Sequence, residues 1–316
     1  MGLTRYLPIA LYVPSTAFAA VFIKVSFGDV TPFLVTFTTF AICWLIFIVW
    51  NAPRLSQLAQ LAKRRKSAMF KLNLYTLLSW LGAFACIKIL TGSVELLVFM
   101  SAIPLASTLA SREWGRLTTM VRALIITIFA CSLVAVVVHP AIANYSLERQ
   151  LFGYLVGIGA GSFGALYIVL SGQEQKAEKL SSVDLICIRL PLLLAVTFAL
   201  CAPEIWNVLS WEFLAKAVLL SAVAVILPAY SLQLSISNIG SVTTSVLMPL
   251  VPIAALGFEW CAGLPMSVVT ITAMVGQCFA IMWVSFARRQ RMPDRPATSA
   301  DPVPLPAVHR PAQNNA

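Results

Sequence analysis

The chain has 316 residues, of which 59% are hydrophobic and 11% charged, and its formal net charge is +10. An ordinary soluble domain carries about 25% charged residues, so this composition excludes a typical water-soluble protein. Apolar runs of about 20 residues recur, long enough to cross a bilayer as helices, and the ten-residue alternation of outer-membrane strands is missing. We therefore expect an all-α membrane protein.

The apolar runs predict ten transmembrane helices, which alternate in direction across the membrane. Their expected spans are 7–23, 31–50, 70–88, 92–111, 119–138, 151–171, 185–202, 212–233, 239–258 and 266–286. The first run follows Arg5 and could be mistaken for a signal peptide. It continues through Ile23, beyond the small-residue site where cleavage would fall, so we interpret it as the first helix.

The segment 51–69 is the most basic connection and contains Lys63-Arg64-Arg65-Lys66. This segment could form either a short amphipathic helix on the membrane surface or an anchored loop, and we favour the loop. The Lys and Arg residues flank apolar runs and have no stacking aromatics among them. This pattern is typical of a membrane surface and argues against nucleic acid as a partner.

A fifteen-residue pattern occurs twice in the chain. Residues 92–106 and 240–254 both fit G-S-V-x3-V-x-M-x3-P-x-A, with seven identical positions, and Glu-Trp follows each copy. The copies lie on the fourth and ninth expected helices, and helices an odd number of positions apart run in opposite directions. The expected fold is two inverted five-helix repeats, 1–138 and 151–288, followed by a Pro-rich tail, 289–316, that we expect to be disordered.

The sixth run carries small residues at high density, among them Gly157, Gly161 and Gly164. Small residues allow helix backbones to approach closely in lipid. The seven cysteines are scattered without a CxxC pair, so we interpret them as apolar core residues and expect no metal and no cofactor.

Charge asymmetry predicts the orientation. With a cytoplasmic N-terminus, 18 of the 22 Lys and Arg residues lie in inner segments, and only Lys24, Lys88, Arg149 and Lys216 lie in outer ones. By the positive-inside rule both termini are cytoplasmic, and we expect a bacterial inner membrane protein. Arg189 is counted among the inner residues, and we expect its side chain to extend to the headgroups.

Four segments carry a resemblance to a known family. They are GSVELLVFMSAIPLASTLASRE at 92–113, GYLVGIGAGSFGALYIVLSGQ at 153–173, LPAYSLQLSISNIGS at 227–241 and SVLMPLVPIAALGFEW at 245–260. Together they resemble the drug/metabolite transporter superfamily, EamA type, and the second is similar to threonine/homoserine-type amino-acid exporters. The chain departs from that pattern at Val251, where members often carry Glu, and at Arg112 and Phe258, which stand in place of Gly.

Glu95 is the one acid expected inside a span. It could meet a substrate ammonium or take a proton, or it could be an interfacial acid paired with Lys88 or Lys216. Pro104 and Pro252 each free a carbonyl four residues earlier, which either kinks a helix toward a substrate path or is a tolerated packing feature. The resemblance implies that helices 3, 4, 8 and 9 border the cavity. The substrate-cavity candidates are Trp80, Glu95, Ser101, Pro104, Tyr167, Tyr230, Gln233, Thr244 and Pro252, with Ser79 and Gln277 as further polar neighbours.

The sequence lacks HExxH, Walker and G-x-S-x-G motifs, so we expect a protein that is not an enzyme. We expect a secondary transporter, a monomer or homodimer, that exports amino acids or similar small metabolites by alternating access, driven by the substrate gradient or by protons. A drug or other metabolite exporter of the same fold is the first alternative. A membrane-embedded lipid-processing enzyme or a receptor is the alternative from another class.

Overall fold

The structure, a computed structural model, describes residues 3–90, 92–110, 114–116, 118–138, 145–208, 210–248, 250–264 and 268–291. These residues form helices and short connections, and no strand occurs among them. In chain order the elements are η1 (Leu3–Tyr6), α1 (Leu7–Ser26), α2 (Pro32–Trp50), η2 (Ala52–Arg54), α3 (Leu55–Arg64), α4 (Lys66–Ile89), α5 (Gly92–Ala110), η3 (Trp114–Arg116), α6 (Thr119–Val138), α7 (Leu147–Glu178), α8 (Ser182–Arg189), α9 (Pro191–Val208), α10 (Trp211–Leu219), η4 (Leu220–Ile226, a π-helix), α11 (Leu227–Leu247), α12 (Leu250–Cys261) and α13 (Val268–Arg291).

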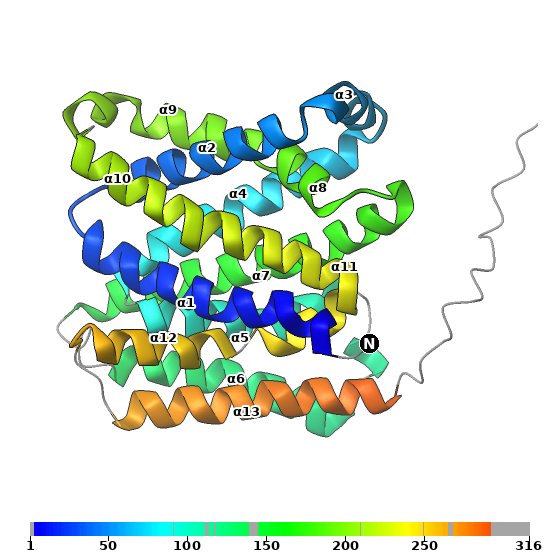
Figure 1. Cartoon of the computed structure of the whole chain (residues 1–316). Coiled ribbons are helices and arrows are strands. Elements are labelled where there is room, and N and C mark those ends of the chain that lie inside the picture. Colours follow the sequence, from blue (N-terminus) through cyan, green and yellow to red (C-terminus); the bar gives the residue numbers. More distant parts are fainter. Residues whose placement is uncertain are drawn as a thin grey trace, which may run out of the picture.

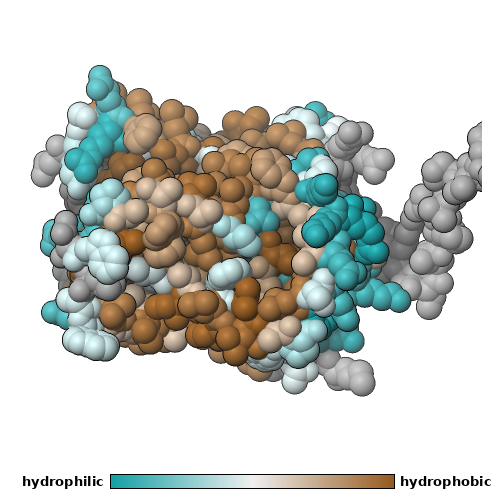
Figure 2. Space-filling view, turned by 90° about the horizontal axis from the view of Figure 1, so that it is seen from above, coloured by the Kyte–Doolittle hydropathy of each residue, from teal (hydrophilic) through white to brown (hydrophobic). Residues whose placement is uncertain are grey.

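Within the described residues, eight helical segments are long and apolar enough to cross a membrane. They are Thr4–Ser26, Pro32–Trp50, Lys66–Ile89, Gly92–Ala110, Thr119–Val138, Leu147–Glu178, Ser182–Trp206 and Trp211–Gly240. Two shorter apolar helices, Leu250–Cys261 and Val268–Ala280, follow. Figure 2 shows a band of hydrophobic side chains across the molecule with hydrophilic side chains toward its two ends. The prediction of an all-α membrane protein is thereby confirmed.

Two expected spans are not continuous helices. The span 185–202 is interrupted between α8 and α9, because Pro191 has no N–H with which to continue the helix. The span 239–258 is divided between α11 and α12 and also contains a non-helical residue, Gly240, at φ 82° and ψ 158°. The apolar pattern of the sequence continues across both breaks, so the pattern does not reveal them.

Helices of each half of the chain pack against the first helix of the other half. From the first half, α4 and α5 pack against α7, and from the second half, α11 and α12 pack against α1. Three further pairs join one helix from each half: α2 with α9, α5 with α12, and α6 with α13. The α2–α9 pair lies at the top of the bundle and the α6–α13 pair at the bottom (Figure 1).

The small residues of α7 lie directly against α5 and α4, as the sequence predicted. A Cβ at Gly161 would lie 2.1 Å from the carbonyl oxygen of Phe99, and one at Gly157 would lie 2.7 Å from Val98. A Cβ at Gly164 would lie 2.8 Å from the ring of Phe99 and 3.0 Å from the hydroxyl of Ser79. Glycine at these positions lets the two helix backbones touch, which places α7 close to the centre of the molecule.

One end of the bundle, here called the basic end, carries Arg54 and the cluster 63–66. The segment between α2 and α4 is helical (η2 and α3), and it buries Leu58 and Leu61, so the favoured prediction of a loop was wrong. Every third or fourth residue of α3 is apolar, and this spacing provides a face that packs inward. The N-terminus lies at the same end of the molecule (Figure 1).

Ion pairs join the two halves of the chain at the basic end. Arg54 pairs with Asp184 at 2.9 Å, and Arg65 pairs with Glu174 at 2.8 Å and Glu178 at 3.6 Å. Arg64 also contacts Glu178, at 2.7 Å.

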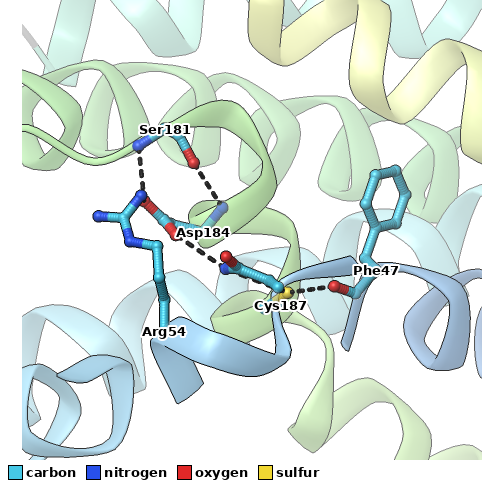
Figure 3. Close-up of polar contacts among 6 residues, drawn as sticks. Phe47, Arg54, Ser181, Asp184 and Cys187 are labelled. Atoms are coloured by element: carbon cyan, nitrogen blue, oxygen red, sulfur yellow. Dashed lines mark hydrogen bonds and ion pairs between the residues drawn. The ribbon is translucent and has the colours of Figure 1, made fainter. Parts of the chain in front are cut away.

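Asp184 is the centre of the buried part of this network. It accepts hydrogen bonds from the backbone N–H of Ser181 and from the side chain of Asn51, both at 2.8 Å (Figure 3). Ser181 and Asp184 form a capping box, so the carboxylate that starts α8 also holds α8 against the end of α2. The thiol of Cys187 donates to the carbonyl of Phe47 one turn farther along.

Candidate functional site

A central cavity lies between α1, α4, α5, α7, η4 and α11. It contains about 780 Å³ of space free of protein atoms, including the part open to solvent. Most of its wall is aliphatic or aromatic. The polar and amphipathic side chains in the wall are Tyr12, Thr16, Ser79, Trp80, Glu95 and Tyr167.

Helical periodicity brings these side chains to one face of each helix. On α1 the wall residues Tyr12, Thr16, Ala19 and Ile23 recur at intervals of three or four. Eleven residues separate the first from the last of them, which corresponds to about 16 Å of helix. The cavity thus extends along a large part of α1, roughly half of a ~30 Å hydrocarbon layer.

Glu95 lies in the cavity wall and is only 2% exposed. No hydrogen bond or ion pair to its carboxylate occurs within the described parts of the chain. Neither lysine considered as its partner is available: Lys88 donates to the carbonyls of Phe27 and Gly28, and Lys216 pairs with Glu212 at 2.6 Å. The structure therefore favours a carboxylate that faces the cavity over an interfacial ion pair.

Arg189 does not extend to the headgroups, which corrects the expectation from its sequence position. It is 1% exposed, and its guanidinium donates a hydrogen bond to the Tyr167 hydroxyl and lies 4.7 Å from the centre of that ring. The Tyr167 hydroxyl in turn donates to Oε1 of Gln233 at 2.5 Å. Contacts from α7 and α11, distant in sequence, hold the side chain inward, and local sequence could not indicate them.

Several wall residues were not anticipated. Met100 and Met248 both line the cavity, and they are the same position in the two copies of the repeated motif. The duplicated methionine was therefore an available signal. Tyr12 and Thr16 were also missed, although two hydroxyl side chains four residues apart in an apolar run indicate one polar helix face.

Six of the nine predicted cavity residues lie outside the wall. Ser101 and Thr244 donate to carbonyls of their own helices, Val98 and Gly240. Tyr230 stacks near Phe47 and Trp50. The other three are Gln233, behind Tyr167, and the two prolines, while Gln277 donates to the carbonyl of Leu97. Trp80, Glu95 and Tyr167 are the predicted residues that the structure brings together at the cavity.

The two motif prolines occupy different positions in their helices. Pro104 lies inside α5 and is buried, with the carbonyl of Pro104 accepting from Thr108 at 2.6 Å. Pro252 is in the first turn of α12, where a missing N–H costs nothing. The carbonyl of Met248, four residues earlier, accepts from the N–H of Val251 at 2.9 Å. The expected mid-helix kink therefore does not occur at Pro252.

Comparison with known proteins gives the fold a precedent. No family model matches the chain, and no curated protein matches its sequence. Among solved structures, one whose only description is "Crystal structure of protein" matches with a TM-score of 0.61 at 15% sequence identity. The match covers 92% of this chain and 99% of that one. At this identity it shows a shared fold over nearly the whole length of both chains and carries no information about substrate.

Proposed function

We propose that this chain is a secondary transporter that exports amino acids or similar small metabolites by alternating access. The observation that carries the proposal is the central cavity with Glu95 in its wall, unpaired within the described residues. A carboxylate deep in a bilayer costs up to about 2.5–3.5 kcal/mol on insertion scales, and such residues usually mark a substrate or proton path. A substrate ammonium or a transferable proton would compensate that cost.

Helices of each half pack against the first helix of the other half, and this arrangement supports an inverted-repeat transporter. We propose that Leu250–Cys261 and Val268–Ala280 are two further crossings beside the eight long spans, which would make ten helices in two sets of five. Both sets contribute to the cavity wall: α1, α4 and α5 from the first, and α7, η4 and α11 from the second. In transporters of this kind the substrate site lies at the repeat interface, and the repeats move about it.

The surroundings we propose are a bacterial inner membrane, with the basic end in the cytoplasm. The cluster 63–66 lies at that end, where anionic headgroups and the positive-inside rule favour it. Transport is favoured over catalysis because the residues that line the cavity include one acid and no histidine. Of the four segments similar to EamA-type transporters, the one at 153–173 resembles amino-acid exporters and favours the same substrate class.

The direct test is uptake into inside-out vesicles that contain the full chain, with a panel of labelled amino acids, in the presence and absence of a proton gradient. We expect saturable uptake of at least one amino acid above vesicles without the protein. A panel of drug-like cations run in parallel tests the alternative exporter class. Uptake of those cations with no amino-acid uptake would overturn the substrate proposed here, and uptake of neither panel would overturn transport.

A further inference from the structure

Three buried polar side chains meet behind the cavity wall. Arg189 comes from α8, Tyr167 from α7 and Gln233 from α11, and their exposed fractions are 1%, 5% and 0%. The Tyr167 hydroxyl joins them, because it accepts from Arg189 and donates to Gln233. Three separate helices thus converge on one point in the core, and one of the three side chains carries a permanent charge.

The groups left over in this cluster are all hydrogen-bond donors. Nε and Nη2 of Arg189 and Nε2 of Gln233 are buried and have no partner within the described residues. No acidic side chain forms an ion pair with Arg189 in that part of the chain. A buried guanidinium without a counter-charge is costly, and its unmet N–H groups require acceptors. A group that supplies both negative charge and acceptor oxygens would satisfy all three atoms.

The cluster borders the cavity at a defined place. Tyr167 itself lines the wall, and Tyr12, also in the wall, lies within electrostatic range of both Arg189 and Glu95. Arg189 and Glu95 do not contact each other, so a positive and a negative group are held apart near one cavity. Arg189 and Gln233 are bonded to the Tyr167 hydroxyl and do not line the cavity themselves, so a carboxylate that enters there reaches the guanidinium and the Gln233 amide only when the Tyr167 side chain gives way.

We propose that Arg189 and Gln233 form, around the Tyr167 hydroxyl, a subsite for the carboxylate of the transported molecule, opposite Glu95, so that the cavity selects zwitterions. The inference rests on the proposed function, since it assigns the substrate class of the same cavity. A carboxylate fits because the planar guanidinium presents paired N–H donors that match two oxygens of one acid group. The ammonium of the same molecule then reaches Glu95.

The test compares matched molecules that differ by one charged group. An amino acid found to be transported is compared with its carboxamide, which lacks the anion, and with its des-amino acid, which lacks the ammonium. The wild-type full chain in vesicles should transport the amino acid at least about tenfold faster than either analogue, because each analogue leaves a buried charge unpaired. Equal transport of the amino acid and its carboxamide would overturn the subsite and leave the proposed function standing.

Variants assign that preference to Arg189. Arg189→Gln should lose most amino-acid transport, while carboxamide transport remains, so that the ratio between the two falls toward one. Arg189→Lys keeps the charge without the planar fork and should raise the KM for the amino acid. Lys71→Gln, which removes an exposed positive charge from α4, is the matched control and should keep the wild-type ratio. An unchanged ratio in Arg189→Gln would overturn the assignment.

A binding measurement on the purified wild-type protein does not depend on variants that fold. The amino acid should raise the thermal midpoint in detergent, and its carboxamide should not, since ligand affinity for the folded state adds directly to stability. Stabilisation by the amino acid without any transport would overturn the proposed function and keep the subsite. Equal stabilisation by the amino acid and the carboxamide would overturn the subsite. No stabilisation by either, together with no transport, would overturn both.

Discussion

Two buried charged residues carry the binding proposed for the core of this molecule. Glu95 and Arg189 are 2% and 1% exposed, and neither belongs to an ion pair within the described residues. Two opposite charges in a low-dielectric interior attract strongly, and a fold that only needed to neutralise them would bring them into contact. Here they form no ion pair with each other, although Tyr12 lies within electrostatic range of both. This separation is what a ligand with two charged groups requires.

Glu95→Gln tests the acidic side of this arrangement. The amide keeps the shape of the side chain but cannot release a proton, and its bond to an ammonium lacks charge assistance. We expect net export to fall by about tenfold or more, since hydrogen bonds to charged groups contribute about 1.5–3 kcal/mol. The pH dependence of transport should flatten, while substrate exchange survives. Transport is measured in vesicles across a pH series.

The control for this variant is Glu212→Gln, which removes an exposed acid bonded to Lys216. It should reproduce the wild-type pH profile. Identical pH profiles for wild type and Glu95→Gln would exclude Glu95 from proton coupling and would favour facilitated diffusion down the substrate gradient.

At the scale of helices, the sequence patterns predicted the type and approximate length of each element but not whether a helix is continuous. The apolar runs located the long helices because lipid requires about 20 apolar residues to span it. The small residues of α7 correctly indicated close packing. The break at Pro191 could have been predicted from the missing N–H of that proline, whereas the break near Gly240 depends on which backbone groups find partners in neighbouring helices, and a one-dimensional pattern does not contain that information.

The α5–α7 contact leads to a prediction with an internal control. Gly161→Ala would place a Cβ 2.1 Å from the Phe99 carbonyl oxygen, so the two helices must separate. Overpacking of this kind costs about 1–3 kcal/mol, which corresponds to several degrees in the thermal midpoint. Gly159→Ala meets nothing within 4 Å and gains helix propensity, so its stability should stay level or rise. Thermal unfolding in detergent measures both, and equal midpoints would contradict the close approach.

The candidate site was less predictable than the fold for a related reason. Trp80, Glu95 and Tyr167 stood out as polar or amphipathic side chains in apolar runs, and they line the cavity. Ser101 and Thr244 stood out equally, but each satisfies its hydroxyl on its own helix. Whether a polar side chain faces the cavity or bonds to its own helix depends on how that helix is rotated about its axis in the bundle. That rotation is fixed by tertiary packing, so sequence alone supplied candidates without ranking them.

At the scale of the whole molecule, the ten crossings proposed above imply that both chain ends lie on the cytoplasmic side. Reporter fusions at residues 60, 145 and 295 should read cytoplasmic, periplasmic and cytoplasmic. Residues 60 and 295 are separated by an even number of crossings, and each of them is separated from residue 145 by an odd number. A reporter that is active only in the cytoplasm, paired with one that is active only in the periplasm, makes each result positive in one assay. A periplasmic result at 295 would contradict ten crossings.

Ion pairs join the two halves of the chain at the basic end, and the proposed alternating access requires them to separate when that end opens. Arg65 contributes two of them, to Glu174 and Glu178, and is itself 41% exposed. Exposed ion pairs contribute little individually, so Arg65→Ala, which removes two of them, should shift the balance toward an open basic end by a small factor. Cys187 is 4% exposed and lies on α8, next to this network. Its rate of modification by a soluble maleimide, followed on the Cys187 peptide by mass spectrometry, should rise by the same factor.

Lys216→Gln removes an ion pair within the second half only, and it should leave that rate unchanged. Equal rates in wild type and Arg65→Ala would show that the ion pairs of Arg65 do not hold the two halves together, and closure would then depend on the contacts of Asp184 with Arg54 and Asn51.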